Sequence, residues 1–440
     1  MANRWKNWSS SVKATPQEIL FPKNESEVQA IVRQAQKDGR KIRVVGAGHS
    51  FTPLIKTDQL IVSLDELSGI VSVDKEKQQA VVWAGTRLKE LGALLFENGL
   101  AMENLGDIDV QSVAGALSTG THGCGIELGV LATQLISITM VTANGELLHL
   151  DPASSPEKFR AAQVSLGTLG IITRMGFQLQ PSYKLKYESE KKTFDHVLEN
   201  LDDYINNNRN FEFYWFPYSE TTQTKVMNIT DEQPKGNGIG AWLNDILLEN
   251  GLFWVISRIS RHIPGTFRAM ARLSAWGVSA SSNTAWSHQV FATKRLVRFQ
   301  EMEYNLPIEN FKAALREVKE SIETFNFKVH FPLECRFVKG DDITISPAHR
   351  RDSAYIAVHS YRGMPYKEYF GAMEAIFKKY NGRPHWGKMH NRTAEELKEL
   401  YPKWDEFQNI RRELDPTGLF LNGYMKELFG EHSRTPVNPA

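Results

Sequence analysis

The stretch Ile42-Arg43-Val44-Val45-Gly46-Ala47-Gly48-His49-Ser50-Phe51 decides the fold, because an apolar run ends there at two glycines and a histidine. Glycines at a strand end let the backbone turn sharply and present its N–H groups to an anion, usually a phosphate. The stretch therefore predicts a strand over residues 41–45 and a loop that holds cofactor phosphates. His49 would then lie beside the cofactor; the plainer alternative is a glycine turn with a hydrogen-bonded histidine.

Two common phosphate-binding motifs do not match this stretch. A Rossmann fingerprint needs G-x-G-x-x-G at the start of a helix, and Phe51 stands at the third glycine position. The P-loop pattern G-x-x-x-x-G-K-[ST] does not occur in the sequence. If residues 46–51 bind cofactor phosphates, they therefore do so through neither of these two motifs.

Length and composition are those of a globular protein. The 440 residues are enough for two or three domains, and 41% are hydrophobic and 23% charged. The net charge of +1 gives no electrostatic argument for nucleic acid. Cys124 and Cys335 form neither a disulfide framework nor a zinc-ligand set. The N-terminus lacks the apolar core of a signal peptide, and no apolar run reaches 18 residues, so we expect a cytoplasmic protein without a transmembrane helix.

Two further segments are rich in glycine and hydroxyl side chains. Residues 111–123 are almost wholly small, and residues 165–173 resemble them in composition. Small side chains over such lengths favour close approach of the backbone to a ligand. Together with residues 46–51, these segments indicate one large, flat, polar ligand rather than three independent turns.

Local patterns mix short strands with helices, which favours an α+β fold. Strands are expected at 61–64, 70–73 and 80–83. A helix should begin with a capping box at Ser26, and another should be capped by Thr86. Near the C-terminus, a single apolar stripe from Leu397 to Leu414 predicts one helix.

The composition changes after Pro181, where aromatic residues become frequent and the glycine clusters end. This places a domain boundary near residue 180. Residues 242–263 form an amphipathic segment followed or overlapped by arginines, which indicates either packing between domains or a role at a membrane surface. Domain packing is the commoner explanation, so membrane association is unexpected but stays open.

Candidate catalytic residues lie in the second half of the chain. Glu334 and Arg336 alternate in a predicted strand and so share one face, either as a structural ion pair or as a site for a polyol. His359 ends the predicted strand 354–359 and either reaches the same cavity or lies in the core. Lys388, in the segment 383–388, is either merely exposed or directed at a flavin ring.

These segments, taken in order, resemble the vanillyl-alcohol-oxidase-type flavoproteins, and within them the sugar-lactone and alditol oxidases. The nearest branch oxidises L-gulono-1,4-lactone and D-arabinono-1,4-lactone, and the likeness runs from about residue 14 to 430. It implies a two-part FAD-binding domain at 1–180 and 396–440. An α+β cap domain at 181–395 would cover the flavin.

The resemblance also implies roles for individual residues. His49 would carry FAD covalently, Glu334 would bind substrate hydroxyls, and Arg336 and Lys388 would stabilise negative charge. The base stays open among His359, Glu334 and Lys388. The remaining residues implied to bind FAD are Gly46, Ala47, Gly48, Ser50, Phe51, Gly106, Asp107, Ser112, Val113, Gly115, Ala116, Ser118, Thr119, Thr121, His122, Gly123, Gly170 and Ile172, together with Lys388.

The implied activity is oxidation of an aldono-1,4-lactone by hydride transfer to flavin N5, with O2 as acceptor and H2O2 as product. Gly106 matches the position that admits oxygen in this family, and Asp107 replaces a serine of alditol oxidases. Cys124 does not match the second flavin attachment point of doubly linked relatives and is expected to be structural. The alternatives are an alditol oxidase acting on xylitol or sorbitol, a dehydrogenase using a quinone or cytochrome, and an FAD-binding module without turnover.

Overall fold

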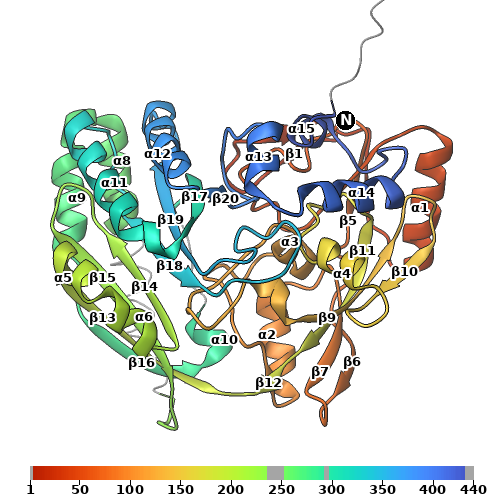
Figure 1. Ribbon diagram of the computed structural model, residues 1–440, viewed down its shortest axis with the longest axis horizontal. Coiled ribbons are helices and arrows are strands. Elements are labelled where there is room, and N and C mark those ends of the chain that lie inside the picture. The colour runs from red at the N-terminus through yellow and green to blue at the C-terminus, as the bar shows by residue number, and fades with distance from the viewer. Residues whose placement is uncertain (1–2, 235–251, 292–296, 432–440) are drawn as a thin grey trace, which may run out of the picture.

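The computed structural model describes residues 3–234, 252–291 and 297–431 and has the expected α+β architecture (Figure 1). Two bodies lie side by side, each built on its own sheet. The first takes in the chain up to Pro181 and the C-terminal helices. The second contains the large antiparallel sheet.

The first body contains two sheets, and the glycine loop (residues 46–51) follows a strand of the smaller one. The parallel sheet has the order β3-β5-β4, formed by β3 (Glu18–Leu20), β4 (Ile42–Val45) and β5 (Leu60–Ser63). The antiparallel sheet has the order β10-β9-β11-β7-β6. Its strands are β6 (Ile70–Asp74), β7 (Gln79–Trp83), β9 (Leu135–Val141), β10 (Leu147–Leu150) and β11 (Ile171–Gln178). The strands predicted near residues 42, 61, 70 and 80 are thus confirmed.

Several helices and two short ribbons complete this body. The helices are α1 (Glu25–Lys37), α2 (Leu88–Glu97), α3 (Val113–Ser118), α4 (Pro156–Gln163), α13 (Ala394–Leu400), α14 (Trp404–Leu414) and α15 (Gly423–Leu428). The ribbons pair β1 (Trp5–Lys6) with β2 (Lys13–Ala14), and β8 (Leu100–Ala101) with β12 (Gln180–Pro181).

The second body is an eight-stranded antiparallel sheet of order β16-β13-β15-β14-β18-β19-β17-β20. Its strands are β13 (Lys184–Thr193), β14 (Asn210–Trp215), β15 (Thr221–Ile229), β16 (Ser281–Trp286), β17 (Phe299–Pro307), β18 (Leu333–Val338), β19 (Ser353–Tyr361) and β20 (Arg383–Pro384). Its helices are α5 (Phe194–Glu199), α6 (Leu201–Asn207), α8 (Leu252–His262), α9 (Phe267–Trp276), α10 (Ser287–Val290), α11 (Phe311–Phe325) and α12 (Lys367–Lys379). Aromatic side chains from this sheet, such as Phe213 and Phe337, form a second core.

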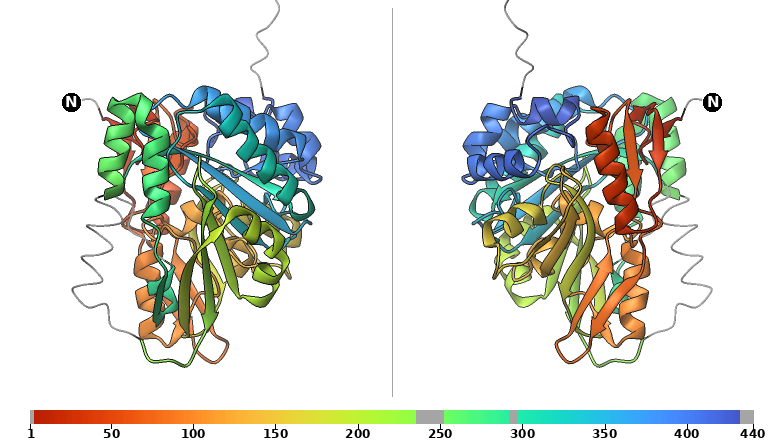
Figure 2. Two further views of the ribbon diagram at one scale, coloured as in Figure 1. Left: turned by 90° about the vertical axis from the view of Figure 1, so that its left-hand side faces the viewer. Right: turned by 90° about the vertical axis from the view of Figure 1, so that its right-hand side faces the viewer.

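The C-terminal segment returns to the first body, as Figures 1 and 2 show in blue. The N–H of Ile42 donates to the carbonyl of Leu419 at 2.9 Å, and the Asn422 side chain donates to the carbonyl of Leu54 at 3.1 Å. Residues from both ends of the chain therefore share one core. The predicted boundaries at residues 180 and 395 stay a prediction.

Three local predictions were wrong. Asn24, not Ser26, caps α1, because its side chain accepts from the N–H of Glu27. Thr86 does not cap α2, since its hydroxyl donates to the carbonyls of Gly69 and Trp83 instead. The stripe 397–414 is divided between α13 and α14, and Pro402 lies in the break between them.

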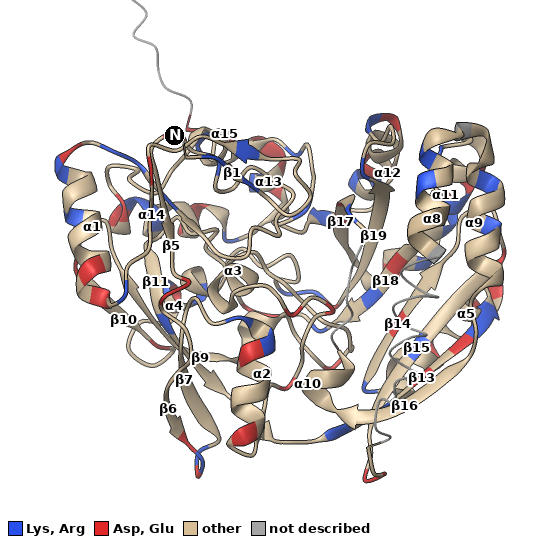
Figure 3. Ribbon diagram, turned by 180° about the vertical axis from the view of Figure 1, so that it is seen from behind, with Lys and Arg blue, Asp and Glu red and all other residues tan. Residues whose placement is uncertain are grey.

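The predicted amphipathic segment is only partly described. Residues 252–262 form α8, which packs against α9, whereas residues 242–251 lie outside the described ranges. Across the ranges that the structure describes, no helix is both long and apolar enough to span a bilayer. Acidic and basic residues both occur along the ribbons of the two bodies (Figure 3), in keeping with the small net charge.

Candidate cofactor and substrate site

Two adjoining cavities lie between the bodies and meet at the glycine loop. Both are lined by His49, Ser50, Gln111 and Thr119. The first cavity also takes in the predicted residues Phe51, Gly106, Asp107, Thr121, His122, Glu334, Arg336, His359 and Lys388. The second takes in Gly46, Ala47, Gly48, Ser112, Gly115, Ser118, Gly170 and Ile172. The structure thus joins the three small-residue segments to the predicted catalytic residues.

Three predicted cofactor residues lie elsewhere. Val113, Ala116 and Gly123 do not line either cavity in the described part of the chain. Val113 and Ala116 are fully buried on the core side of α3. A Cβ on Gly123 would lie 2.3 Å from the carbonyl oxygen of Leu105, so close packing of two backbone segments accounts for this glycine.

The glycine loop is held tightly against α3. A Cβ on Gly46 would lie 2.0 Å from the hydroxyl of Ser112, which itself accepts from the N–H of Gly115 and caps the helix. Gly48 has a φ of +67°, a left-handed conformation that favours glycine. The small residues of this loop therefore allow it to pack closely against α3, and they also leave room for a ligand.

His49 lies where the two cavities meet. Trp8 stacks on its ring with centroids 5.5 Å apart, and burial lowers the pKa of the imidazole below its ordinary value. A neutral imidazole is the form that acts as a nucleophile. The stacking partner Trp8 was not predicted, because nothing in its local sequence connects it with residue 49.

The cavities fit a flat cofactor with a phosphate-bearing tail. The second cavity is lined mostly by glycine, alanine and small hydroxyl residues. In the first, the hydroxyl of Thr121 is buried without a hydrogen-bond partner among the described residues. A buried polar atom without a partner at a cavity wall indicates a bound ligand. Both observations suit FAD.

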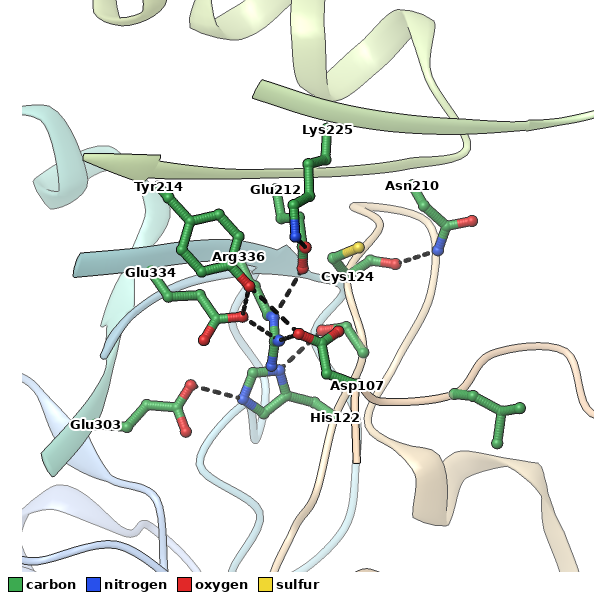
Figure 4. A network of polar contacts seen from close by, with 12 residues as sticks. Asp107, His122, Cys124, Asn210, Glu212, Tyr214, Lys225, Glu303, Glu334 and Arg336 are labelled. Atoms are coloured by element: carbon green, nitrogen blue, oxygen red, sulfur yellow. Dashed lines mark hydrogen bonds and ion pairs between the residues drawn. The ribbon is translucent and has the colours of Figure 1, made fainter. Parts of the chain in front are cut away.

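Arg336 is surrounded by three carboxylates (Figure 4). Its terminal nitrogen lies 2.7 Å from Asp107 and also contacts Glu334, and its Nε donates to Glu212 at 3.0 Å. Burial opposes the charge, but these carboxylates hold the pKa of Arg336 above its ordinary value. Tyr214 donates to Glu334 at 2.7 Å and so fixes that carboxylate.

Strand register produces this network. In the pairing of β14 with β18, Glu212 stands opposite Arg336, and Tyr214 stands opposite Glu334. Directly opposite side chains on an antiparallel pair are within contact distance. The predicted shared face of Glu334 and Arg336 is confirmed, and the facing strand contributes a second polar pair.

Lys388 lies between two buried glutamates of β17. Its ammonium is 2.5 Å from Glu301 and 4.0 Å from Glu303. Although burial opposes ionisation, Lys388 and His359 lower the pKa of Glu301 to about 2. His122 and Lys388 likewise hold the pKa of Glu303 well below its ordinary value, although burial acts in the opposite direction. Both carboxylates are therefore ionised at neutral pH.

Two histidines approach the same glutamates in a common manner. His359 stands opposite Glu301 in the register of β19 with β17, and their side chains are 3.5 Å apart. His122 lies 3.2 Å from Glu303. In each histidine the Nδ1 faces a backbone carbonyl, at 3.2 Å and 2.8 Å respectively. The Nε2 of each ring faces its glutamate, so each histidine lies between a backbone carbonyl and a carboxylate.

The two glutamates were not predicted as site residues, although a signal exists. Glu301, Glu303 and Asn305 alternate with the apolar residues Met302 and Tyr304. Charged side chains at every second position of an otherwise apolar strand are unusual unless they have partners. His385 was also not predicted as a site residue. Burial lowers the pKa of its imidazole to about 3, so it lines the first cavity as a neutral ring.

Cys124 lies outside the lining of both cavities. Its thiol is buried, and burial raises its pKa well above the ordinary value. The carbonyl of the same residue accepts from the side chain of Asn210 (Figure 4). A structural role for Cys124 stays a prediction.

Family models match nearly the whole chain. The family described as D-arabinono-1,4-lactone oxidase matches residues 175–428, which is more than half of the sequence. An FAD binding domain matches residues 16–151. The lactone-oxidase match begins within β11, the last long strand of the first body, and continues through the second body to the C-terminal helices.

Whole-length relatives carry related names. An L-gulono-1,4-lactone dehydrogenase of Mycobacterium tuberculosis is 39% identical over 98% of this chain and 100% of its own. An L-gulonolactone oxidase of Bos taurus is 35% identical over 97% and 98%. A D-arabinono-1,4-lactone oxidase of Yarrowia lipolytica is 28% identical over 95% of each chain.

Solved structures show the same fold. Cholesterol oxidase from Brevibacterium sterolicum superposes with a TM-score of 0.82 at 20% identity, covering 98% of this chain and 97% of that one. This likeness concerns the fold alone. The family models and the relatives show that this chain belongs to the sugar-1,4-lactone oxidase family of FAD-dependent oxidoreductases.

Proposed function

We propose that this protein oxidises an aldono-1,4-lactone, of the L-gulono or D-arabinono type, with FAD held in the two joined cavities. The observation that carries the proposal is the convergence of Glu334, Arg336, His359 and Lys388 on the cavity that also contains His49. FAD bound there would supply the acceptor for a hydride from a carbinol C–H. The names of the whole-length relatives support the lactone as substrate.

Among the candidate bases, the hydrogen bonds favour His359. Its Nδ1 faces the carbonyl of Pro332, its Nε2 lies 3.5 Å from the carboxylate of Glu301, and the residue lines the first cavity. The carboxylate of Glu301 would stabilise the imidazolium that forms when Nε2 takes the hydroxyl proton. Lys388 already lies 2.5 Å from Glu301 and would instead stabilise negative charge on the substrate oxygen.

For the electron acceptor, we propose O2, with H2O2 as product. Gly106 lines the first cavity, and the absence of a side chain there leaves room beside the reacting centre. A Cβ at this position would lie 3.0 Å from the carbonyl oxygen of His122, so any larger residue would be displaced. The second candidate is a dehydrogenase, because the relative with 39% identity carries that name.

One experiment separates these functions. The purified holoprotein is mixed without oxygen with L-gulono-1,4-lactone or xylitol, the flavin absorbance is followed, and air or oxidised cytochrome c is then admitted. Bleaching by the lactone and rapid recovery in air are expected. Recovery only with cytochrome c identifies a dehydrogenase, bleaching only by xylitol an alditol oxidase, and no bleaching a binding module without turnover.

A covalent bond between His49 and FAD is also proposed. His49→Ala protein should release its yellow colour on acid precipitation, because the flavin would lack a covalent anchor. His359→Ala, which removes a histidine from the same cavity, is the matched control and should keep colour in the pellet. Colour that stays in the His49→Ala pellet would show that the attachment lies elsewhere.

A further inference from the structure

The helices α8 and α9 carry much of the exposed apolar surface of the molecule. They pack against each other at one end of the second body (Figures 1 and 3). Eleven large hydrophobic side chains are exposed in the described ranges, and five of them lie on or beside these helices. The five are Trp254, Val255, Ile263, Leu273 and Trp276. Single exposed apolar side chains are ordinary, but such a concentration indicates an interaction surface.

The same stretch of chain is strongly basic. Residues 252–276 contain four arginines and neither Asp nor Glu, although the net charge of the whole protein is only +1. The Nε of Arg268 donates to the side chain of Asn326 at 2.9 Å, and the Nε of Arg272 donates to the carbonyl of Tyr218 at 3.2 Å. These acceptors are neutral, so they leave the positive charge of both guanidinium groups in place.

Helical spacing places the tryptophans and arginines together. In α8, Trp254, Arg258 and Arg261 follow one another at intervals of four and three residues, which brings them to one side of the helix. The guanidinium of Arg258 lies over the ring of Trp254, 5.0 Å from its centroid. In α9, Arg272 and Trp276 are four residues apart, and Trp276 is 77% exposed. Each helix therefore presents both an indole ring and guanidinium groups on its outer side.

The inner sides of the two helices account for their packing in the second body. Ile256 in α8 and Ala271 and Ala275 in α9 are buried. The ring of Phe253 meets that of Phe331 edge-on, with centroids 4.7 Å apart. Packing between elements thus explains only half of the amphipathic pattern, because it leaves the outer tryptophans and arginines unused.

We propose that the outer face of α8 and α9 binds the surface of an anionic phospholipid bilayer. Indole rings favour the boundary between polar headgroups and acyl chains, because they combine an apolar body with a polar N–H. Arginines beside them are attracted to anionic headgroups. Apolar rings and charge of one sign on the same side are typical of helices that lie in the plane of a membrane surface. The attachment is peripheral and leaves the first cavity unchanged.

The test is co-sedimentation of the purified holoprotein with phosphatidylcholine vesicles that contain or lack phosphatidylglycerol. Binding to the anionic vesicles should be at least about tenfold tighter than to the neutral ones, because the arginines meet opposite charge. Raising NaCl from about 0.05 M to about 0.5 M should release most of the protein, since salt screens this attraction. Equal affinity for both vesicles, or binding to neither, would overturn the proposal.

Charge variants locate the surface. Arg258→Gln combined with Arg261→Gln should weaken binding to the anionic vesicles by at least about tenfold. The matched control is Lys75→Gln combined with Lys77→Gln, which removes the same charge from the exposed turn between β6 and β7 and should bind like the wild type. Equal weakening by both pairs would show that only the net charge matters, and this outcome would contradict a role for α8.

A tryptophan variant tests the apolar part of the same face. Trp276→Ser should weaken binding to the anionic vesicles by about fivefold or more, because the exposed indole no longer enters the headgroup region. Phe21→Ser, which removes an exposed aromatic side chain from the first body, is the control and should have no effect. Equal binding by Trp276→Ser and the wild type would overturn this part of the proposal.

Flavin absorbance shows whether each variant is folded, since the inner sides of the helices and both cavities are left intact. Bleaching by L-gulono-1,4-lactone reports separately on the proposed function, which membrane binding does not require. If an arginine or tryptophan variant does not fold, the dependence of wild-type binding on anionic lipid and salt still decides the question.

Discussion

At the scale of single residues, the site is built from charges that depend on one another. Glu301 and Glu303 are almost completely buried, and ionised carboxylates are tolerated there only because Lys388 and the neighbouring histidines compensate them. Lys388, for which we propose a catalytic role, therefore also stabilises the first cavity. Substitution of any one of these residues should therefore alter the interactions of all the others.

Lys388→Met should lower the free energy of unfolding by about 3 to 5 kcal/mol at pH 7, because it leaves Glu301 buried without its cation. Glu301→Gln added to Lys388→Met should restore part of the loss. Urea denaturation measures both effects. The control is Lys379→Met, whose exposed ammonium pairs with Glu317 at 2.7 Å and should matter by less than about 1 kcal/mol.

The same pair predicts a pH dependence. The pKa of Glu301 is lowered to about 2 in the folded protein, so its ionised form stabilises the fold above its ordinary pKa, and this stability is lost as the pH falls toward 2. Lys388→Met should lose this dependence between about pH 4.5 and 2. An identical acid unfolding profile for both proteins would show that the ion pair does not contribute.

At the scale of elements, strands with alternating polar residues form the working surface of the second body. β14, β17, β18 and β19 contribute Glu212, Glu301, Glu334 and His359 to the network around the first cavity. Because side chains on a strand point to opposite faces in turn, the other face is left for the aromatic core. One face of this sheet thus packs in the aromatic core, and the other carries the polar residues around the first cavity.

Helix capping gives a test of local structure. Asn24→Ala should destabilise the first turn of α1 by about 1 kcal/mol, since its side chain accepts from the N–H of Glu27, whereas Ser26→Ala should change it by less than about 0.5 kcal/mol. Hydrogen exchange of the amides in residues 25–37 measures the difference. Equal effects of the two substitutions would contradict the assignment of the cap.

At the scale of the whole molecule, a buried arginine ties distant segments to the glycine loop. Arg43 in β4 donates to the carbonyls of Leu54 at 2.7 Å and Leu166 at 2.8 Å, and also to those of Gly167 and Phe420. It thereby connects the third glycine-rich segment and the C-terminal segment to the strand that precedes His49. The second cavity is bounded by this same arginine.

Arg43→Met should lower the free energy of unfolding by at least about 3 kcal/mol, because several buried carbonyls would lose their donor. It should also increase cleavage by proteases after residue 396, where the C-terminal helices depend on these contacts. Arg40→Met is the matched control, since Arg40 forms ion pairs with Glu18 and Asp38 near the surface. Equal protease sensitivity of the two variants would argue against this role of Arg43.

The sequence by itself determined what depends on neighbours along the chain. The strand and glycine turn at residues 42–48 follow from apolar residues and glycine, and the shared face of Glu334 and Arg336 follows from the two-residue period of a strand. The family, and with it FAD as cofactor, also followed from the order of the motifs. These features need no knowledge of long-range contacts.

Only the tertiary structure decided which side chains meet. Asp107 and Glu212 reach Arg336 from segments other than β18, and the register of β14 with β18 places Glu212 opposite it. The capping of α1 and α2 also differs from the prediction. Asn24 caps α1, and the Thr86 hydroxyl donates to the carbonyl of Trp83 instead of capping α2. A pattern fixes the face on which a residue lies. The partner on that face depends on strand pairing and loop packing, which join residues more than a hundred positions apart.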